Sequence, residues 1–140
     1  MGRAKVVTVL SQKGGAGKST LTMQLAGGLV RKGLRVVVID LDPQETALRW
    51  SHAAPEGTPF PATVIQLGTA VDGLGACLRK IVREGGIVLL DCPPSIEHPA
   101  TVAALQEADV ALVPVVPSPA DLWSTKGVER LILQAEASRM

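Results

Sequence analysis

Short apolar segments alternate with helical patterns along this chain, and the alternation restricts the possible fold more than any other feature. The segments expected to be strands are residues 5–10, 35–40, 62–67, 86–92 and 108–116. Helical patterns follow them at residues 19–32, 46–52, 71–83, 99–107 and 124–137. Strands that are apolar along their whole length are buried on both faces. We therefore predict an α/β fold: a doubly wound, mainly parallel sheet of about five strands with helices on both faces.

Length and composition narrow the class of protein. The 140 residues suit a single domain, residues 1–140. Aromatic residues make up 2% of the chain and its net charge is +1, which argues against stacking on single-stranded nucleic acid and against strong DNA binding by the chain as a whole. Cys77 and Cys92 are far apart and lack the spacing of metal ligands. With no apolar run long enough to cross a bilayer, we expect a cytoplasmic protein that does not bind membranes.

The segment SQKGGAGKST, residues 11–20, joins the first predicted strand to the first predicted helix. It differs from the phosphate-binding pattern G-x-x-x-x-G-K-[ST], because Gln12 stands where the first glycine belongs and Lys13 precedes the glycine pair. Glycines here can adopt positive φ and bring backbone N–H groups close to phosphate oxygens. The predicted nucleotide-binding residues are Gly14, Gly15, Ala16, Gly17, Lys18, Ser19 and Thr20.

Three aspartates stand where predicted strands end. Asp91 closes the apolar run IVLL, the position expected for an acid that organises Mg²⁺. Asp40 and Asp42, in the segment DLDPQ, follow the second predicted strand. Ligands bind at the carboxyl ends of the strands in open α/β sheets. We therefore expect Ser19 and Asp91 on the metal side of the site, and we expect Asp40, Asp42 or both to reach the metal, its waters or an attacking water.

KGGAGKST, DLDPQ and LLDCPPS, in this order and spacing, resemble the ParA/MinD family of deviant Walker A ATPases, most closely the small plasmid-type ParA proteins. The resemblance implies ATP or ADP and Mg²⁺ as cofactors, and slow hydrolysis of ATP to ADP and phosphate. It implies that Lys13 is the family's signature lysine, which crosses an ATP-dependent homodimer to the partner's phosphates. Lys13, Lys18 and Asp42 are then the expected catalytic residues.

The other roles also follow from the resemblance. Lys18 matches the Walker lysine, Ser19, with Thr20 behind it, the Mg²⁺-side hydroxyl, and Asp91 the Walker B acid. Asp42 matches the aspartate of the switch I loop that orients the hydrolytic water, and Asp40 is expected to hold switch I and the water shell of the metal. The implied function is an ATP-dependent dimerising switch that positions a plasmid, a chromosome region or a protein assembly. An adaptor, centromere-binding or cargo protein is the expected partner.

Family members continue for several strands and helices beyond the fifth strand–helix unit, so we expect this chain to lack the C-terminal part that carries much of the adenine recognition and the basic surface for nonspecific DNA. Three alternatives remain open. The first is a metabolic ligase or synthetase on the same scaffold, such as the dethiobiotin or cobyrinic acid enzymes. The second is an iron–sulfur or nickel-handling relative, which needs paired cysteines. The third is a nucleotide-binding remnant that does not hydrolyse ATP.

Overall fold

The computed structural model describes residues 2–11, 17–67, 71–115 and 117–138. Its strands form one five-stranded parallel sheet in the order β3-β2-β4-β1-β5, as the apolar segments predict. The strands are β1 (Lys5–Val9), β2 (Val36–Asp40), β3 (Thr63–Gln66), β4 (Ile87–Asp91) and β5 (Val110–Leu112). The helices are α1 (Lys18–Arg31), α2 (Thr46–His52), η1 (Val71–Gly73, a 3₁₀ turn), α3 (Leu74–Val82), α4 (Pro99–Gln106) and α5 (Pro119–Ser138).

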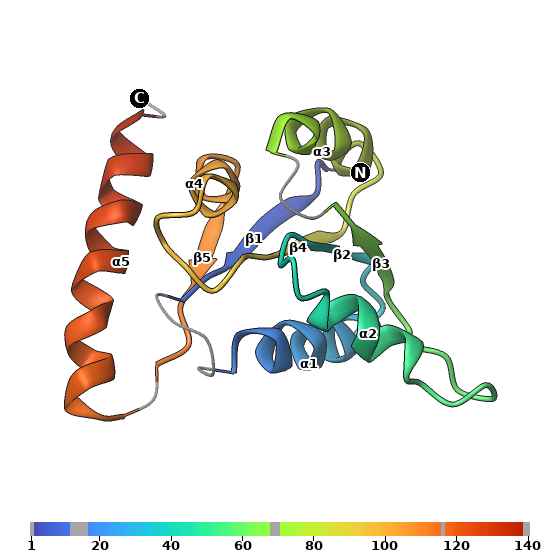
Figure 1. The fold of residues 1–140 in the computed structure, drawn as a ribbon. Coiled ribbons are helices and arrows are strands. Elements are labelled where there is room, and N and C mark those ends of the chain that lie inside the picture. The colour runs from blue at the N-terminus through green and yellow to red at the C-terminus, as the bar shows by residue number, and fades with distance from the viewer. Residues whose placement is uncertain (1, 12–16, 68–70, 116, 139–140) are drawn as a thin grey trace.

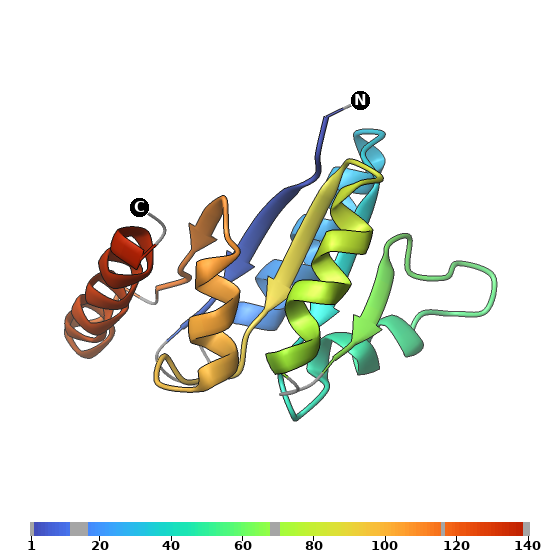
Figure 2. The same cartoon turned by 90° about the horizontal axis from the view of Figure 1, so that it is seen from above.

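Helices cover both faces of the sheet, which confirms the doubly wound arrangement (Figure 1). On one face, α1 and α2 bury Met23, Ala26 and Ala47 against β2 and β4. On the other face, α3 and α4 bury a larger aliphatic cluster that includes Leu78 and Leu105. Seen from above, α5 lies beyond β5 at the edge of the sheet (Figure 2). The three central strands are therefore enclosed between two layers of helices.

The register of the central strands brings the predicted acids together. Asp40 at the end of β2 stands beside Asp91 at the end of β4, and Val9 of β1 stands on the other side of Asp91. The loop to α1 begins just after β1. The carboxyl ends of β1, β2 and β4 thus form one edge that carries the phosphate loop and both carboxylates.

The fifth predicted strand is wrong in extent, since it was expected over residues 108–116 and β5 covers Val110–Leu112. Pro114 follows two residues later and has no N–H to donate to a sheet. The last helix is predicted at residues 124–137, yet α5 begins five residues earlier, at Pro119. Proline is favoured in the first turn of a helix, where the N–H has no helical acceptor, and the apolar pattern gave no sign of this start.

In the part of the chain that the structure describes, no helix is both long enough and apolar enough to cross a membrane.

Candidate functional site

The described part of the phosphate loop begins at Gly17, which caps the N-terminus of α1. Its φ of 80° is in the left-handed region, where a side chain would be strained. No side chain caps this end of the helix, and the Gly17 carbonyl accepts a hydrogen bond from the Leu21 N–H at 2.8 Å. The N–H groups of the first turn therefore point outward, as they do where helices bind anions. Lys13, Gly14, Gly15 and Ala16 lie outside the described residues.

Lys18 is turned into the protein, where it contacts two of the predicted acids. Its side chain is 6% exposed, and Nζ donates a short hydrogen bond to Asp91 Oδ1. Nζ also lies 3.8 Å from Asp42 Oδ2. The Lys18 ammonium thus offsets negative charge on both carboxylates.

Ser19 completes the contacts of Asp91. The Ser19 hydroxyl donates to Asp91 Oδ2 at 2.8 Å, so both oxygens of this fully buried carboxylate have a donor. Burial raises the pKa of Asp91, while the charge and hydrogen bond of Lys18 and the hydrogen bond of Ser19 act to lower it. The Lys18 charge is therefore the main compensation for an acid placed at the end of a buried strand.

Asp40 and Asp42 lie on the loop that leads from β2 to α2. Asp42 is buried, and its Oδ1 accepts a hydrogen bond from the Gln44 N–H at 2.9 Å. Asp40 is also buried, and its Oδ1 accepts a hydrogen bond from the Asp42 N–H at 3.0 Å. Burial raises the pKa of Asp40, and hydrogen bonds from two backbone N–H groups oppose that rise. Asp42 faces Lys18, whereas Asp40 bonds to the backbone of its own loop.

A cavity of about 310 Å³ opens above these groups. Its lining consists of Ser11, Gly17, Lys18, Ser19, Thr20, Asp42, Gln44, Thr46 and Pro94. The structure thus gathers four predicted residues of the phosphate loop and one predicted acid around one space, with Asp91 beneath Lys18. Asp40 does not line it. Four lining residues were missed in the sequence, although each lies in a segment that follows the end of a strand: Ser11, Gln44, Thr46 and Pro94.

The donor set fits Mg²⁺ held together with phosphates. Ser19 and Asp91 present a hydroxyl and a carboxylate oxygen beside the Walker lysine. Mg²⁺ keeps several waters and is commonly bound through one or two carboxylates together with substrate phosphates. Within the described ranges, no group of three or more His, Cys, Asp and Glu side chains could hold a metal ion alone. The site therefore suits a metal that arrives with a nucleotide.

Comparison of the sequence with known proteins identifies a family. The family model "CobQ/CobB/MinD/ParA nucleotide binding domain" matches residues 7–134. The chain is 36% identical to the chromosome-partitioning ATPase Soj of Thermus thermophilus, over 98% of this chain and 64% of that protein. It is 32% identical to the maintenance of carboxysome distribution protein A of Halothiobacillus neapolitanus, over 92% of this chain and 59% of that protein. The chain thus spans less than two thirds of the length of these relatives.

A solved structure shows the same fold. Cobyrinic acid a,c-diamide synthase from Mycobacterium smegmatis, with bound ADP and magnesium, superposes with a TM-score of 0.82 at 22% identity, over 96% of this chain and 69% of that one. At this identity the likeness concerns the fold. The family model, by contrast, covers almost the whole chain together with its phosphate loop and acids. This chain belongs to the CobQ/CobB/MinD/ParA family of nucleotide-binding domains.

Proposed function

We propose that this chain is the nucleotide-binding domain of a ParA-like ATPase, an ATP-dependent dimerising switch that positions a plasmid, a chromosome region or a protein assembly. The observation that carries the proposal is the contact of Lys18 with Asp91 and Asp42 at the mouth of the phosphate cavity. Sequence identity above 30% to a partitioning ATPase and to a carboxysome-distribution protein also supports the proposal. The cofactors we propose are ATP or ADP with Mg²⁺.

In the mechanism that we propose, Lys18 exchanges its contact with carboxylates for a contact with the phosphates of the nucleotide. Its ammonium donates a hydrogen bond to Asp91 in the structure. When a triphosphate enters, Lys18 turns to the phosphates, aided by the N–H groups at the start of α1. Ser19 and Asp91 would then hold the Mg²⁺ that accompanies the nucleotide, and this ion would neutralise charge on the phosphates. Asp42, whose carboxylate lines the cavity, accepts a hydrogen bond from the attacking water and orients it.

We propose that Lys13 takes part in dimerisation. The site already has its own lysine in Lys18, so a second lysine on the loop gains a role by reaching a partner's triphosphate across a two-fold interface. Bound ATP then becomes part of the interface and favours the dimer. We propose a cytoplasmic homodimer of this kind, with an adaptor, centromere-binding or cargo protein as a further partner.

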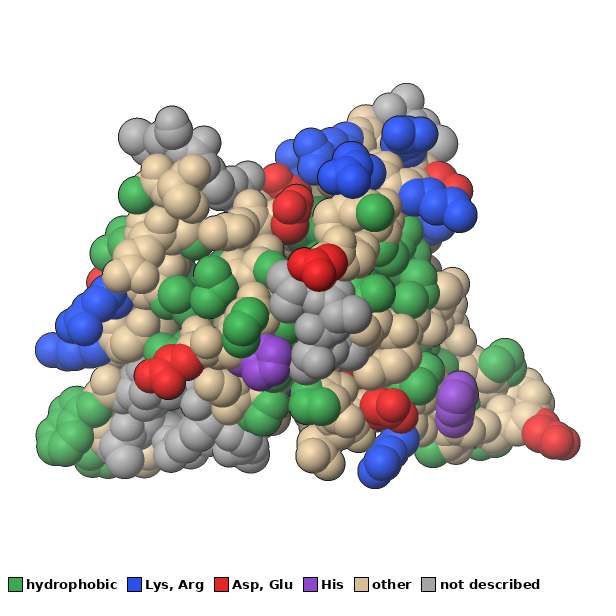
Figure 3. Space-filling view, turned by 45° about the horizontal axis from the view of Figure 1, so that its top comes forward, with side chains coloured by type: hydrophobic (Ala, Val, Ile, Leu, Met, Phe, Trp, Pro, Cys, Tyr) green, Lys and Arg blue, Asp and Glu red, His purple; other side chains and the backbone are tan. Residues whose placement is uncertain are grey.

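We also propose that the chain contacts DNA, at the end of the sheet opposite the phosphate cavity. Lys and Arg side chains gather there over α3 (Figure 3). Arg79 and Lys80 in the last turn of α3 are exposed, as is Arg83. Lys5 is joined to the same region by its N–H, which donates to the Gly86 carbonyl at 3.0 Å. A cluster of positive charge of this kind suits sequence-independent contact with phosphates.

The ligase and metal-handling alternatives have less support. The synthetase of Mycobacterium smegmatis shares the fold at 22% identity, whereas the relatives above 30% identity include Soj and the carboxysome-distribution protein. Cys92 is buried, and Cys77 lies on α3. Neither cysteine belongs to a metal-ligand cluster among the residues described. A partitioning or positioning ATPase is the function that the site supports best.

The proposal is tested by separating binding from chemistry at Asp42. Asp42→Ala is expected to retain ATP and Mg²⁺ and to slow hydrolysis, because the side chain that orients the water is removed. Phosphate release and ATP affinity are measured for the wild type, for this variant and for Asp72→Ala, an exposed acid on η1 that serves as control. Hydrolysis at the normal rate in Asp42→Ala would show that Asp42 is a turn residue.

The dimer is tested with Lys13→Ala. This variant is expected to bind ATP as a monomer and to lose ATP-dependent dimerisation and hydrolysis together. Sedimentation with ATP and Mg²⁺ compares it with the wild type and with Lys126→Ala, an exposed lysine on α5. An undiminished dimer in Lys13→Ala contradicts a role across the interface.

A further inference from the structure

Asp40 is a buried carboxylate that the proposed chemistry does not use. It is the last residue of β2 and none of its surface is exposed. It does not line the cavity, although Asp42, two residues later, does. Burying an ionised group is unfavourable unless its oxygens are hydrogen-bonded. Both oxygens of Asp40 therefore need hydrogen-bond donors inside the protein.

The two oxygens of Asp40 accept hydrogen bonds from two places, the loop after β2 and the first turn of α2. Oδ1 accepts a hydrogen bond from the Asp42 N–H at 3.0 Å. Oδ2 accepts one from the Leu48 N–H, in the first turn of α2, at 3.1 Å. An ionised carboxylate is an acceptor at both oxygens, whereas an asparagine amide has one acceptor and places donors at the other position. One side chain thus joins the backbone of Asp42 to the start of α2.

The contact with Leu48 replaces a helix cap that α2 lacks. The N-cap residue is Glu45, and its side chain makes no capping hydrogen bond. Leu48 is the third residue of α2, and the N–H at that position is one of those that an N-cap side chain normally satisfies. Asp40 supplies the missing acceptor from the end of the neighbouring strand. The start of α2 is therefore fixed to the sheet through this side chain.

The backbone between these two contacts is strained. Glu45 has a φ of 56°, and among the described residues other than glycine it alone has a positive φ. Such a conformation is unfavourable for an L-residue with a side chain and persists where the surroundings impose it. The Glu45 N–H donates to the Asp42 carbonyl at 2.9 Å, which closes the loop tightly between the two anchored amides.

We propose that Asp40 is a positioning residue that couples the start of α2 to the carboxylate of Asp42, so that a displacement of α2 changes the rate of hydrolysis. The proposal rests on the function proposed above, in which Asp42 orients the attacking water. Of the two roles expected for Asp40, it keeps the hold on the switch I loop and extends it to the start of α2, in place of the role at the water shell of the metal. A partner that shifts α2 then has a direct route to the reacting water.

The variant Asp40→Asn tests the coupling, with Asp72→Asn as the matched control at an exposed acid. Hydrogen exchange of individual amides, followed by NMR in the nucleotide-free protein, reports the two contacts without any need for activity. We expect the Asp42 or the Leu48 amide in Asp40→Asn to exchange about tenfold faster or more, because a hydrogen bond to a charged acceptor is lost. Unchanged protection of both amides would overturn the proposal.

The second arm compares affinity with turnover. We expect kcat to fall about tenfold to a hundredfold in Asp40→Asn, since misplacing a catalytic group has effects of that size, while the Kd for ATP stays the same. Normal kcat despite lost protection overturns the positioning role, and so does an equal loss of affinity and turnover. If the wild type does not hydrolyse ATP, the proposed function fails, and the amide exchange still decides whether Asp40 holds the two backbone amides. Asp40→Ser, which leaves one short acceptor, provides the second variant if Asp40→Asn does not fold.

Discussion

The centre of the sheet and its β5 edge differ in how they are held together. In β2 and β4 every residue except Ile87 is buried, and the predicted acids stand at their carboxyl ends. At the edge, β5 has three residues and none of them is buried. A strand with neighbours on both sides and helices on both faces is fixed by many contacts at once. Asp40 and Asp91 thus belong to the enclosed part of the sheet, and β5 lies at its exposed edge.

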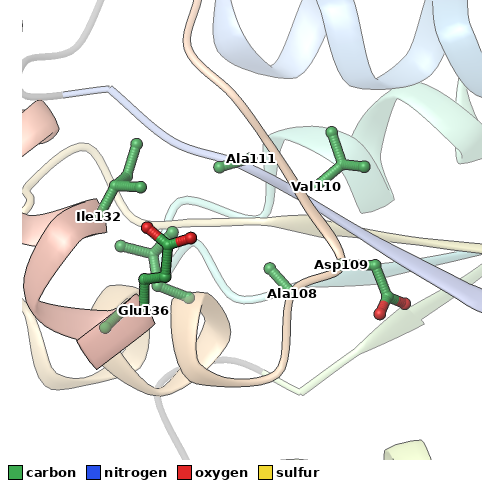
Figure 4. A pocket seen from close by; sticks show the side chains of 8 residues that line it. Ala108, Asp109, Val110, Ala111, Ile132 and Glu136 are labelled. Atoms are coloured by element: carbon green, nitrogen blue, oxygen red, sulfur yellow. The ribbon is translucent and has the colours of Figure 1, made fainter. Parts of the chain in front are cut away.

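The edge also leaves apolar surface in contact with water. Val110, Val115 and Leu133 are 49%, 40% and 57% exposed. A cavity of about 160 Å³ separates β5 from α5, with Ile132 and Glu136 of α5 across from Ala108 and Ala111 (Figure 4). A second cavity, of about 290 Å³, continues along α5 beside Val113 and Val115. The helix therefore stands off from the strand that it flanks.

The largest expected effect on stability comes from the ion pair in the centre. Lys18→Ala leaves the buried Asp91 carboxylate without its cation, and breaking a buried pair in this way lowers the free energy of unfolding by about 4 kcal/mol. Burial raises the pKa of Asp91, so the loss should shrink at acid pH, where the carboxyl takes up a proton. Urea unfolding of the nucleotide-free wild type and variant at two pH values measures both. A loss below about 1 kcal/mol at neutral pH contradicts the role of this pair.

Truncation of an apolar side chain compares the two regions directly. Leu89 in β4 is fully buried, and Leu89→Ala is expected to lower the free energy of unfolding by about 3 kcal/mol through lost burial and a cavity. Val110 in β5 is half exposed, and Val110→Ala is expected to lower it by less than about 1 kcal/mol. Thermal and urea unfolding of both variants give the difference. Equal losses would show that the β5 edge is as firmly packed as the centre.

The smallest effect concerns the two thiols. Burial raises the pKa of Cys92 to about 12 from an ordinary value of 9.0, and burial also raises the pKa of Cys77, which is partly exposed. In native protein at pH 8 we expect a thiol reagent to modify Cys77 slowly and Cys92 only after unfolding. Between pH 9 and 12 the unfolded chain loses a proton that folded Cys92 keeps, so stability falls with rising pH. Rapid native labelling of Cys92 would show that the end of β4 opens.

Much of the centre was predictable because its signals are local. The apolar runs marked β1, β2 and β4 to within two residues at each end, and the helix predicted at residues 46–52 coincides with α2. The end of β5 was not predictable from hydrophobicity, because residues 108–116 are almost all apolar whether or not they pair. The strand ends at Leu112, two residues before Pro114, and hydrophobic periodicity does not mark the start of α5 at Pro119.

The contacts within the site were less predictable than its residues. Lys18 and Asp91 were both identified from their motifs, yet their pairing across 73 positions follows from the register of β1 with β4. The attachment of Asp40 to Leu48 depends on the path of a short loop through the left-handed backbone of Glu45. Sequence patterns report residue types and strand ends, and hydrogen-bond partners require the fold.

In the proposed mechanism, Lys18 leaves Asp91 to bind the phosphates of ATP. Its most direct test is the calorimetric titration of the wild type, Lys18→Ala and Lys126→Ala with ATP and Mg²⁺. The account predicts binding by the wild type and by Lys126→Ala, and at least a hundredfold weaker binding by Lys18→Ala, because the only side-chain cation in the described lining of the cavity is removed. Equal affinity in all three proteins would contradict it.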